Sequence, residues 1–203
     1  MKKVINNIKI AIDLELEQPN TNHQTPDSRI DSPKIIQLGW SVFNQETGKI
    51  LNEGSRFVNI GVPISSFIKG LTRITDEQIS SGGTVTSAFM ELRKVRELHN
   101  ADRTMVEWGS GDFVSLRDEV IDESGKSYWN EINAFGRSPV NVKHLYRVFR
   151  ESNGLNPSGG LSRAVAGLGL TWSGQGKHDA MIDARNTAMV YCKLFKAMRS
   201  PNE

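Results

Sequence analysis

The sequence has no long apolar run and only one cysteine. A helix that spans a bilayer needs roughly 20 consecutive apolar residues, and no stretch approaches that length, so we expect no membrane contact. The basic start, Met1–Asn7, lacks the apolar core and the cleavage site of a signal peptide. Because Cys192 has no partner for an intramolecular disulfide, the sequence favours a reducing, cytoplasmic location.

A strong excess of either charge is also missing. The net charge is +2, whereas dedicated duplex-binding proteins are usually far more basic. This balance neither indicates nor excludes a nucleic-acid substrate, because carboxylates gathered around metal ions lower the net charge of an enzyme. With 37% hydrophobic and 24% charged residues, we expect a single globular domain over residues 1–203.

The predicted secondary structure indicates an α/β fold with a mixed central β-sheet flanked by helices. Apolar, β-branched runs predict a first strand that ends at Asp13–Leu16, followed by strands over 35–43, 50–60 and 104–108. Helical periodicity and caps predict helices that start at residue 75 and that cover 85–100, 112–120, 142–151, 158–167 and 179–198. We interpret residues 18–34 as a flexible insertion and residues 199–203 as a short tail.

Two carboxylates lie close together at the end of the first predicted strand. Asp13 and Glu15 are two residues apart, so their side chains leave the same face of the strand. Like charges on one face are costly unless a cation lies between them, and Mg²⁺ prefers oxygen ligands. Asp-x-Glu alone is more often a solvated strand edge. Here it ends an otherwise apolar strand, where a solvated face is least expected, and this favours a metal site.

Two later segments add two carboxylates and a histidine. Asp112 follows Trp108 and a glycine turn, at a predicted helix start where an N-cap is the commoner role. His178 precedes Asp183 at the start of the last helix and can take a proton from water near neutral pH. Taken alone, such a histidine is more often a surface residue. Asp179 is better interpreted as the N-cap of the last helix.

In this order and separation, Asp-x-Glu, Trp-Gly-x-x-Asp and His-x4-Asp resemble the motifs of the DEDDh exonucleases, the DnaQ-like branch of the ribonuclease H superfamily. Other segments in register also resemble the family: Ile35–Gly39 its second strand, Phe67–Ile79 its Leu-Thr-Gly-Ile-Thr segment, and Asp183–Ala188 its last helix. Arg73 replaces a glycine of that segment. The tryptophan motif and Asn141–Tyr146 look closest to the exoribonucleases that trim histone-message and small-RNA ends.

The resemblance implies a metal-dependent 3′-to-5′ exonuclease acting on the 3′ ends of single-stranded nucleic acid, with RNA slightly favoured over DNA. It implies two divalent ions, Mg²⁺ or Mn²⁺, and release of nucleoside 5′-monophosphates. The metal ligands would be Asp13, Glu15, Asp112 and Asp183, and His178 would be the general base.

Substrate contacts are expected from five side chains. These are Leu16, Thr72, Phe113, Lys143 and Arg147. Lys143 and Arg147 are one helical turn apart and are placed to follow a phosphate backbone, although an ordinary solvated helix face is at least as common. For Phe113, a place in the core remains the alternative to stacking on a base.

Two other functions stay open. A catalytically silent nucleic-acid-binding module of the same fold is disfavoured, because all five active residues are present. A ribonuclease H-like endonuclease would use similar two-metal chemistry. The histidine before the last aspartate favours the exonuclease.

Overall fold

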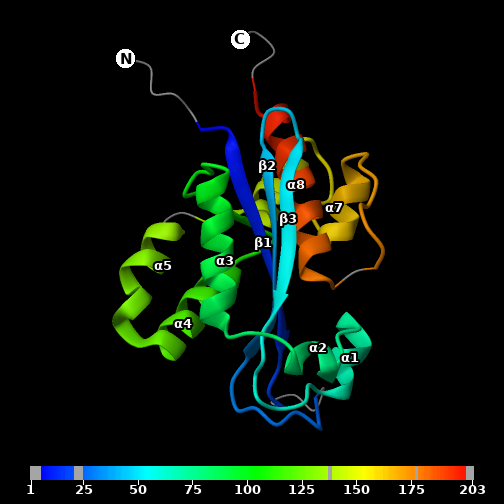
Figure 1. Cartoon of the computed structure of the whole chain (residues 1–203). Helices are drawn as coiled ribbons and strands as arrows, with labels where there is room; N and C mark the ends of the chain where they lie inside the picture. Colours follow the sequence, from blue (N-terminus) through cyan, green and yellow to red (C-terminus); the bar gives the residue numbers. More distant parts are fainter. Residues whose placement is uncertain (1–5, 21–24, 137–138, 177, 200–203) are drawn as a thin grey trace.

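The protein, described by a computed structural model over residues 6–20, 25–136, 139–176 and 178–199, is built on one five-stranded sheet (Figure 1). The strands are β1 (Ile8–Glu17), β2 (Lys34–Asn44), β3 (Ile50–Phe57), β4 (Met105–Glu107) and β5 (Val140–Asn141). Their order in the sheet is β3-β2-β1-β4-β5. β2 runs antiparallel to both of its neighbours, β1 and β3, whereas β4 is parallel to β1 and β5 is parallel to β4. The expected mixed sheet is confirmed.

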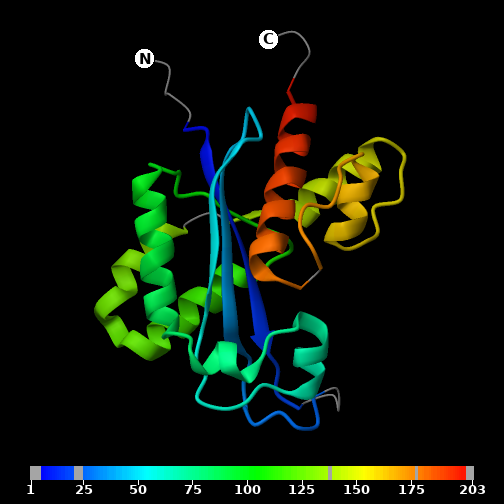
Figure 2. The same ribbon diagram turned by 45° about the vertical axis from the view of Figure 1, so that its right-hand side comes forward.

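Helices cover both faces of this sheet (Figures 1 and 2). The helices are α1 (Ser66–Thr72), α2 (Asp76–Ser80), α3 (Val85–Leu98), α4 (Asp112–Ser124), α5 (Trp129–Phe135), α6 (Val142–Ser152), α7 (Leu161–Gly167) and α8 (Ala180–Ala197), with a 3₁₀ turn at Gly125–Tyr128. Helices α3, α4 and α5 pack on one face, and α6, α7 and α8 pack on the other. Within the described residues, no helix combines the length and hydropathy needed to cross a bilayer.

The alternation of side chains in β1 determines which face carries the carboxylates. Ile10 and Ile12 are fully buried against α3, α4 and α5, whereas Ala11 is buried on the opposite side with residues of α8. Because successive side chains of a strand point to opposite faces, Asp13 and Glu15 share the side of Ala11. They therefore face α8.

Helices α1 and α5 and strand β5 were not predicted. Each of the two helices is only seven residues long, and β5 has two residues. Such short elements show too little periodicity to be recognised. The short helix α2 was recognised through its cap, and the capping box is confirmed: Thr75 and Gln78 exchange side-chain and backbone hydrogen bonds.

The predicted insertion over residues 18–34 is anchored in its described part. The Asp27 carboxylate accepts a hydrogen bond of 2.8 Å from the Ser66 N–H, the first residue of α1. Thr25 is buried, and its hydroxyl donates to the Pro19 carbonyl at 3.0 Å. The segment therefore supports the start of α1. Residues 21–24 and, apart from Arg199, the predicted tail over 199–203 lie outside the described residues.

Candidate active site

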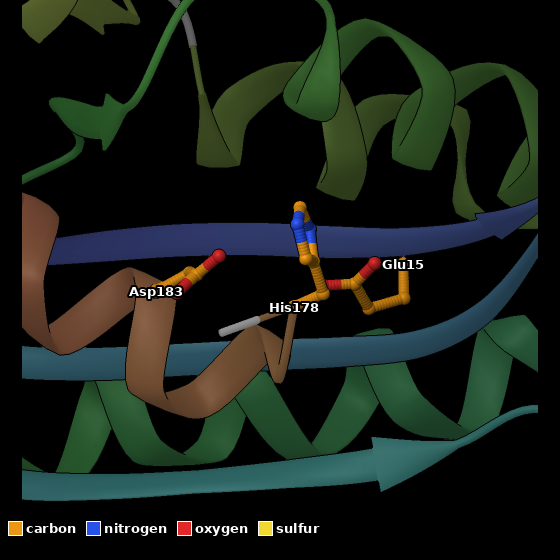
Figure 3. Close-up of side chains that lie close together, drawn as sticks. All are labelled: Glu15, His178 and Asp183. Carbon is orange, nitrogen blue, oxygen red and sulfur yellow. The ribbon is translucent and has the colours of Figure 1, made fainter. Parts of the chain in front are cut away.

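The start of α8 lies against the carboxylate end of β1. Asp179 is the N-cap of α8, as predicted, and its carboxylate accepts from the N–H groups of Met181 and Ile182 at 3.0 and 3.2 Å. Asp183 follows in the first turn. One ligand atom each of Glu15, His178 and Asp183 lies within 4.8 Å of the others. Figure 3 shows these three side chains, which come from β1, from the loop before α8 and from α8.

Gly39 permits this close approach. It pairs with Asp13 across β1 and β2. A Cβ atom at Gly39 would lie 2.1 Å from the carbonyl carbon of Ala180 and 2.3 Å from the nitrogen of Met181. The main chain of α8 therefore rests directly on β2, beside the strand that carries Asp13.

Gln37 joins the same two elements by a hydrogen bond. It pairs with Glu15 across the sheet, and its side-chain oxygen accepts from the Ala180 N–H at 3.1 Å. Gln37 is 2% exposed, so this bond is shielded from water. Neither Gln37 nor Gly39 was predicted to serve the site. Their only signal in the sequence was their place in the segment that resembles the family's second strand.

The turn that carries Asp112 is fixed by a residue that was not predicted to serve the site either. Helix α4 begins at Asp112 and its N-cap is Gly111, so the alternative role of Asp112 as an N-cap is wrong. The capping group is instead the buried carboxylate of Glu107. It accepts from the N–H groups of Gly111 and Phe113, at 3.4 and 3.1 Å. Because these two N–H groups flank Asp112, the Glu107 side chain fixes the turn that carries it.

Burial and mutual repulsion perturb the site carboxylates. Burial, followed by the carboxylates of Asp112, Asp183 and Glu15, raises the pKa of Asp13 well above its ordinary value. Burial, followed by Asp183 and Asp179, raises the pKa of Glu15 to about 8. Burial and the nearby Glu107 raise the pKa of Asp112 to about 7. The repulsion on Asp13 also shows that the predicted carboxylates are close enough to interact.

Without a cation, these groups cannot all be ionised at neutral pH. A divalent cation among them would restore the charged forms, because it replaces repulsion by attraction. Carboxylate oxygens are the donors that Mg²⁺ and Mn²⁺ prefer. The residues present therefore fit a divalent cation, and Asp13, Glu15, Asp112 and Asp183 are the side chains that would hold it.

The five expected substrate contacts have different surroundings. Phe113 is 4% exposed and lies in the core, so it has no free face for a base. Thr72 is also buried, and its hydroxyl donates to the Ile68 carbonyl and accepts from the Ile74 N–H. Both side chains are buried, so neither is free to contact the substrate in the way that was predicted.

The other three expected contacts reach the surface. Leu16 is partly exposed and lines a cleft together with Pro33 and Ser115. Lys143 and Arg147 are exposed on α6. Arg147 forms an ion pair of 3.4 Å with Glu151 of the same helix, and this pair is well exposed to solvent. An exposed pair of this kind is weak, and the contact of Arg147 with the substrate stays a prediction.

Comparison with known proteins places this architecture among nucleases. Residues 10–191 match the RNase T family model, which is described as exonuclease. No curated protein sequence matches the chain.

Several solved structures have a similar fold. The nuclease domain of 3′hExo, described as a DEDDh family member bound to rAMP, is 19% identical, with a TM-score of 0.76 over 95% of this chain and 94% of that chain. A 3′-exonuclease described in recognition of the histone mRNA stem-loop is 18% identical, with a TM-score of 0.75 over 97% and 84%. S. pombe Pop2p in its Mg²⁺- and Mn²⁺-bound form is 17% identical, with a TM-score of 0.66 over 95% and 84%.

Proposed function

Because the chain belongs to the exonuclease family whose model spans residues 10–191, we propose that it shortens single-stranded nucleic acid from the 3′ end with two divalent cations and a histidine base. The predictions of the ribonuclease H-like fold and of an exonuclease are confirmed. The DEDDh type and the 3′-to-5′ direction are part of the proposal, and the similar 3′-exonuclease structures support them. The observation that carries the mechanism is the convergence of carboxylates from β1, α4 and α8 beside His178.

The carboxylates have distinct places around the proposed cations. The charges of Asp112, Asp183 and Glu15 all act on Asp13, so Asp13 is the side chain that would contact both ions. Glu15 and Asp183 would complete one site, and Asp112 the other. When bound, the cations activate the attacking water and stabilise the leaving 3′-oxygen.

His178 is proposed to take the proton of that water. The residue is exposed, and its ring nitrogen lies within 4.8 Å of a carboxylate oxygen of Glu15 and of Asp183. As the water oxygen bonds to phosphorus and the bond to the 3′-oxygen breaks, the histidine becomes cationic. The neighbouring carboxylates would stabilise this charge. The products are a nucleoside 5′-monophosphate and a shortened chain.

RNA is proposed as the slightly favoured substrate. In support, one similar structure is described in recognition of a histone mRNA stem-loop, and another is bound to rAMP. Mg²⁺ or Mn²⁺ is proposed as the metal, since the donors are carboxylates and the similar Pop2p structure is described with both ions. We also propose a cytoplasmic location, on the ground that the single cysteine, Cys192, is buried and free.

The test uses 5′-labelled single-stranded RNA and DNA of equal sequence, incubated with Mg²⁺ or Mn²⁺. We expect a ladder that shortens from the 3′ end and that is absent with EDTA and in Asp13→Ala. Asp118→Ala, which removes an exposed aspartate of α4, should keep full activity. Cuts within a circular substrate would indicate the endonuclease instead. Normal metal binding without any cleavage would indicate the silent binding module.

The role of His178 is tested separately. His178→Ala should lower kcat by roughly 10²- to 10⁴-fold, the usual contribution of general acid–base catalysis. The Mg²⁺ concentration for half-maximal activity should change little, because the carboxylates remain. His99→Ala, at the end of α3, serves as the control. If His178→Ala abolished metal binding, His178 would be a ligand and not the base.

A further inference from the structure

The loop that carries His178 is tied to α8 by a buried amide. This segment, which we call the histidine loop, comprises residues 170–176 and His178. The Asn186 side chain accepts the Ser173 N–H at 3.0 Å and donates to the Ser173 carbonyl at 2.9 Å. Its amide also donates to the Ile182 carbonyl at 2.8 Å. Asn186 is 0% exposed, so its amide is shielded from solvent, whereas Ser173 at the other end of two of these bonds is partly exposed.

A second set of contacts holds the same point of the loop. Arg185 donates to the Ser173 hydroxyl at 3.2 Å and to the Glu53 carboxylate of β3 at 2.6 Å. Within the loop, the Trp172 indole N–H donates to the Gly176 carbonyl at 2.9 Å. Ser173 is therefore fixed to α8 and, through Arg185, to β3. His178 lies five residues after this fixed point in the sequence.

The backbone of His178 needs such support. Its φ of 60° lies in the left-handed region, which residues other than glycine adopt only against steric strain. A loop with glycines at 174 and 176 has other conformations available. The observed one persists only if surrounding contacts select it. Among the described residues, the Asn186 clamp on Ser173 is the most deeply buried of these contacts.

We propose that Asn186 is a positioning residue: it fixes the histidine loop on α8 and thereby holds His178 beside Glu15 and Asp183. The inference rests on the proposed role of His178 as the base. Asn186 would touch neither the substrate nor the cations. Its contribution to the rate is the correct placement of one catalytic group, for which an error of about 1 Å costs about 10²-fold.

A double-mutant cycle tests this role. The four proteins are the wild type, Asn186→Ala, His178→Ala and the double variant, each assayed for kcat, KM and the half-saturating Mg²⁺ concentration. Asn186→Ala should lower kcat by about 10- to 100-fold, with KM and the Mg²⁺ requirement within about twofold. In the His178→Ala background the same change should lower kcat by less than about threefold, because residues that act as a unit are not additive.

Thr187→Val is the matched control. Thr187 is the next residue of α8 and is also 0% exposed, and its hydroxyl has no hydrogen-bond partner within the part of the chain that the structure describes. The Thr187→Val variant should retain full kcat. Where Asn186→Ala does not fold, Asn186→Asp enters the same cycle, since it keeps an acceptor for the Ser173 N–H but loses both donated bonds.

The outcomes separate the two proposals. An undiminished kcat in Asn186→Ala, or an equal loss in both backgrounds, would overturn the positioning role while leaving His178 as the base. An undiminished kcat in His178→Ala would overturn the base itself. A rise of the Mg²⁺ requirement in Asn186→Ala, with kcat at saturation unchanged, would show that Asn186 supports the metal ligand Asp183 instead of the loop.

Discussion

Gly39→Ala should inactivate the enzyme with only a modest loss of stability. The added Cβ would lie 2.1 Å from the Ala180 carbonyl carbon, whereas ordinary contacts begin at 3.4 Å. The obstacle is backbone on both sides, since Gly39 lies in β2 between its hydrogen-bonded neighbours β1 and β3. Helix α8 must therefore move away from the sheet by about 1.3 Å, and it carries Asp183 with it.

The expected energies show that the loss of activity in Gly39→Ala would come from displacement of α8 and not from unfolding. Forcing extra atoms into a packed contact costs typically about 1–3 kcal/mol, and a domain is usually stable by roughly 5–15 kcal/mol, so most molecules stay folded. A displacement of about 1 Å at a catalytic group costs about 10²-fold in rate. The loss of kcat should thus far exceed any loss of folded protein.

The assay combines steady-state cleavage of a labelled single-stranded oligonucleotide with thermal unfolding of the same samples. Gly160→Ala is the control, because nothing lies within 4 Å of a Cβ at that glycine and its φ of −83° suits alanine. It should leave kcat unchanged. Normal kcat and normal thermal stability in Gly39→Ala would mean that α8 does not rest on β2 at this point, and the account of how Asp183 reaches Asp13 would be refuted.

Three further predictions concern charge and backbone strain. Without metal, the free energy of unfolding should fall as pH rises from about 4.5 to about 8, because folded Glu15 keeps a proton that the unfolded chain releases. The rise of Tm on adding Mg²⁺ should therefore be larger at pH 8 than at pH 5. Equal rises at the two pH values would contradict the raised pKa of Glu15. Glu107→Ala should destabilise the protein by about 1–2 kcal/mol in denaturant unfolding, as loss of a helix cap does. Glu107→Gln should destabilise it less, because glutamine keeps a hydrogen-bond acceptor. Equal losses in the two variants would argue against the role of Glu107 as the cap. Arg73→Gly should stabilise the protein by up to about 1 kcal/mol. The left-handed backbone of Arg73, at a φ of 64°, costs more free energy than the conformational entropy that glycine adds to the unfolded chain. A measured loss of stability would show that the arginine side chain forms contacts that outweigh this strain.

Features with a local cause were predictable from the sequence. The placement of Asp13 and Glu15 on one face follows from the alternation of a strand. The roles of Thr75 and Asp179 as helix caps depend on hydrogen bonds to residues two or three positions ahead. In each case the residues that determine the structure are neighbours in the chain, so a short stretch of sequence contains the whole pattern.

Features caused by distant packing were not predictable in this way. The contact of Gly39 with Ala180 joins residues 141 positions apart, and nothing near Gly39 in the sequence indicates it. Phe113 lies in the core because Gly136 leaves room for its ring, which a Cβ at Gly136 would meet at 2.4 Å. The expectation that Phe113 contacts the substrate failed for this reason.

Contacts of Glu107 and Gln37 explain how the fold remains stable although the carboxylates of the site repel one another. With its carboxylates unpaired by metal, the site repels itself, which is why burial and like charges raise the pKa of Asp13 and Glu15. Repulsion of this kind would separate β1, α4 and α8, the elements that carry the charges. The contacts that oppose it are formed by other groups: Glu107 holds the turn of α4, and Gln37 bonds to the first residue of α8. Because a cation removes the repulsion while these contacts remain, metal binding should stabilise the folded protein as well as activate it.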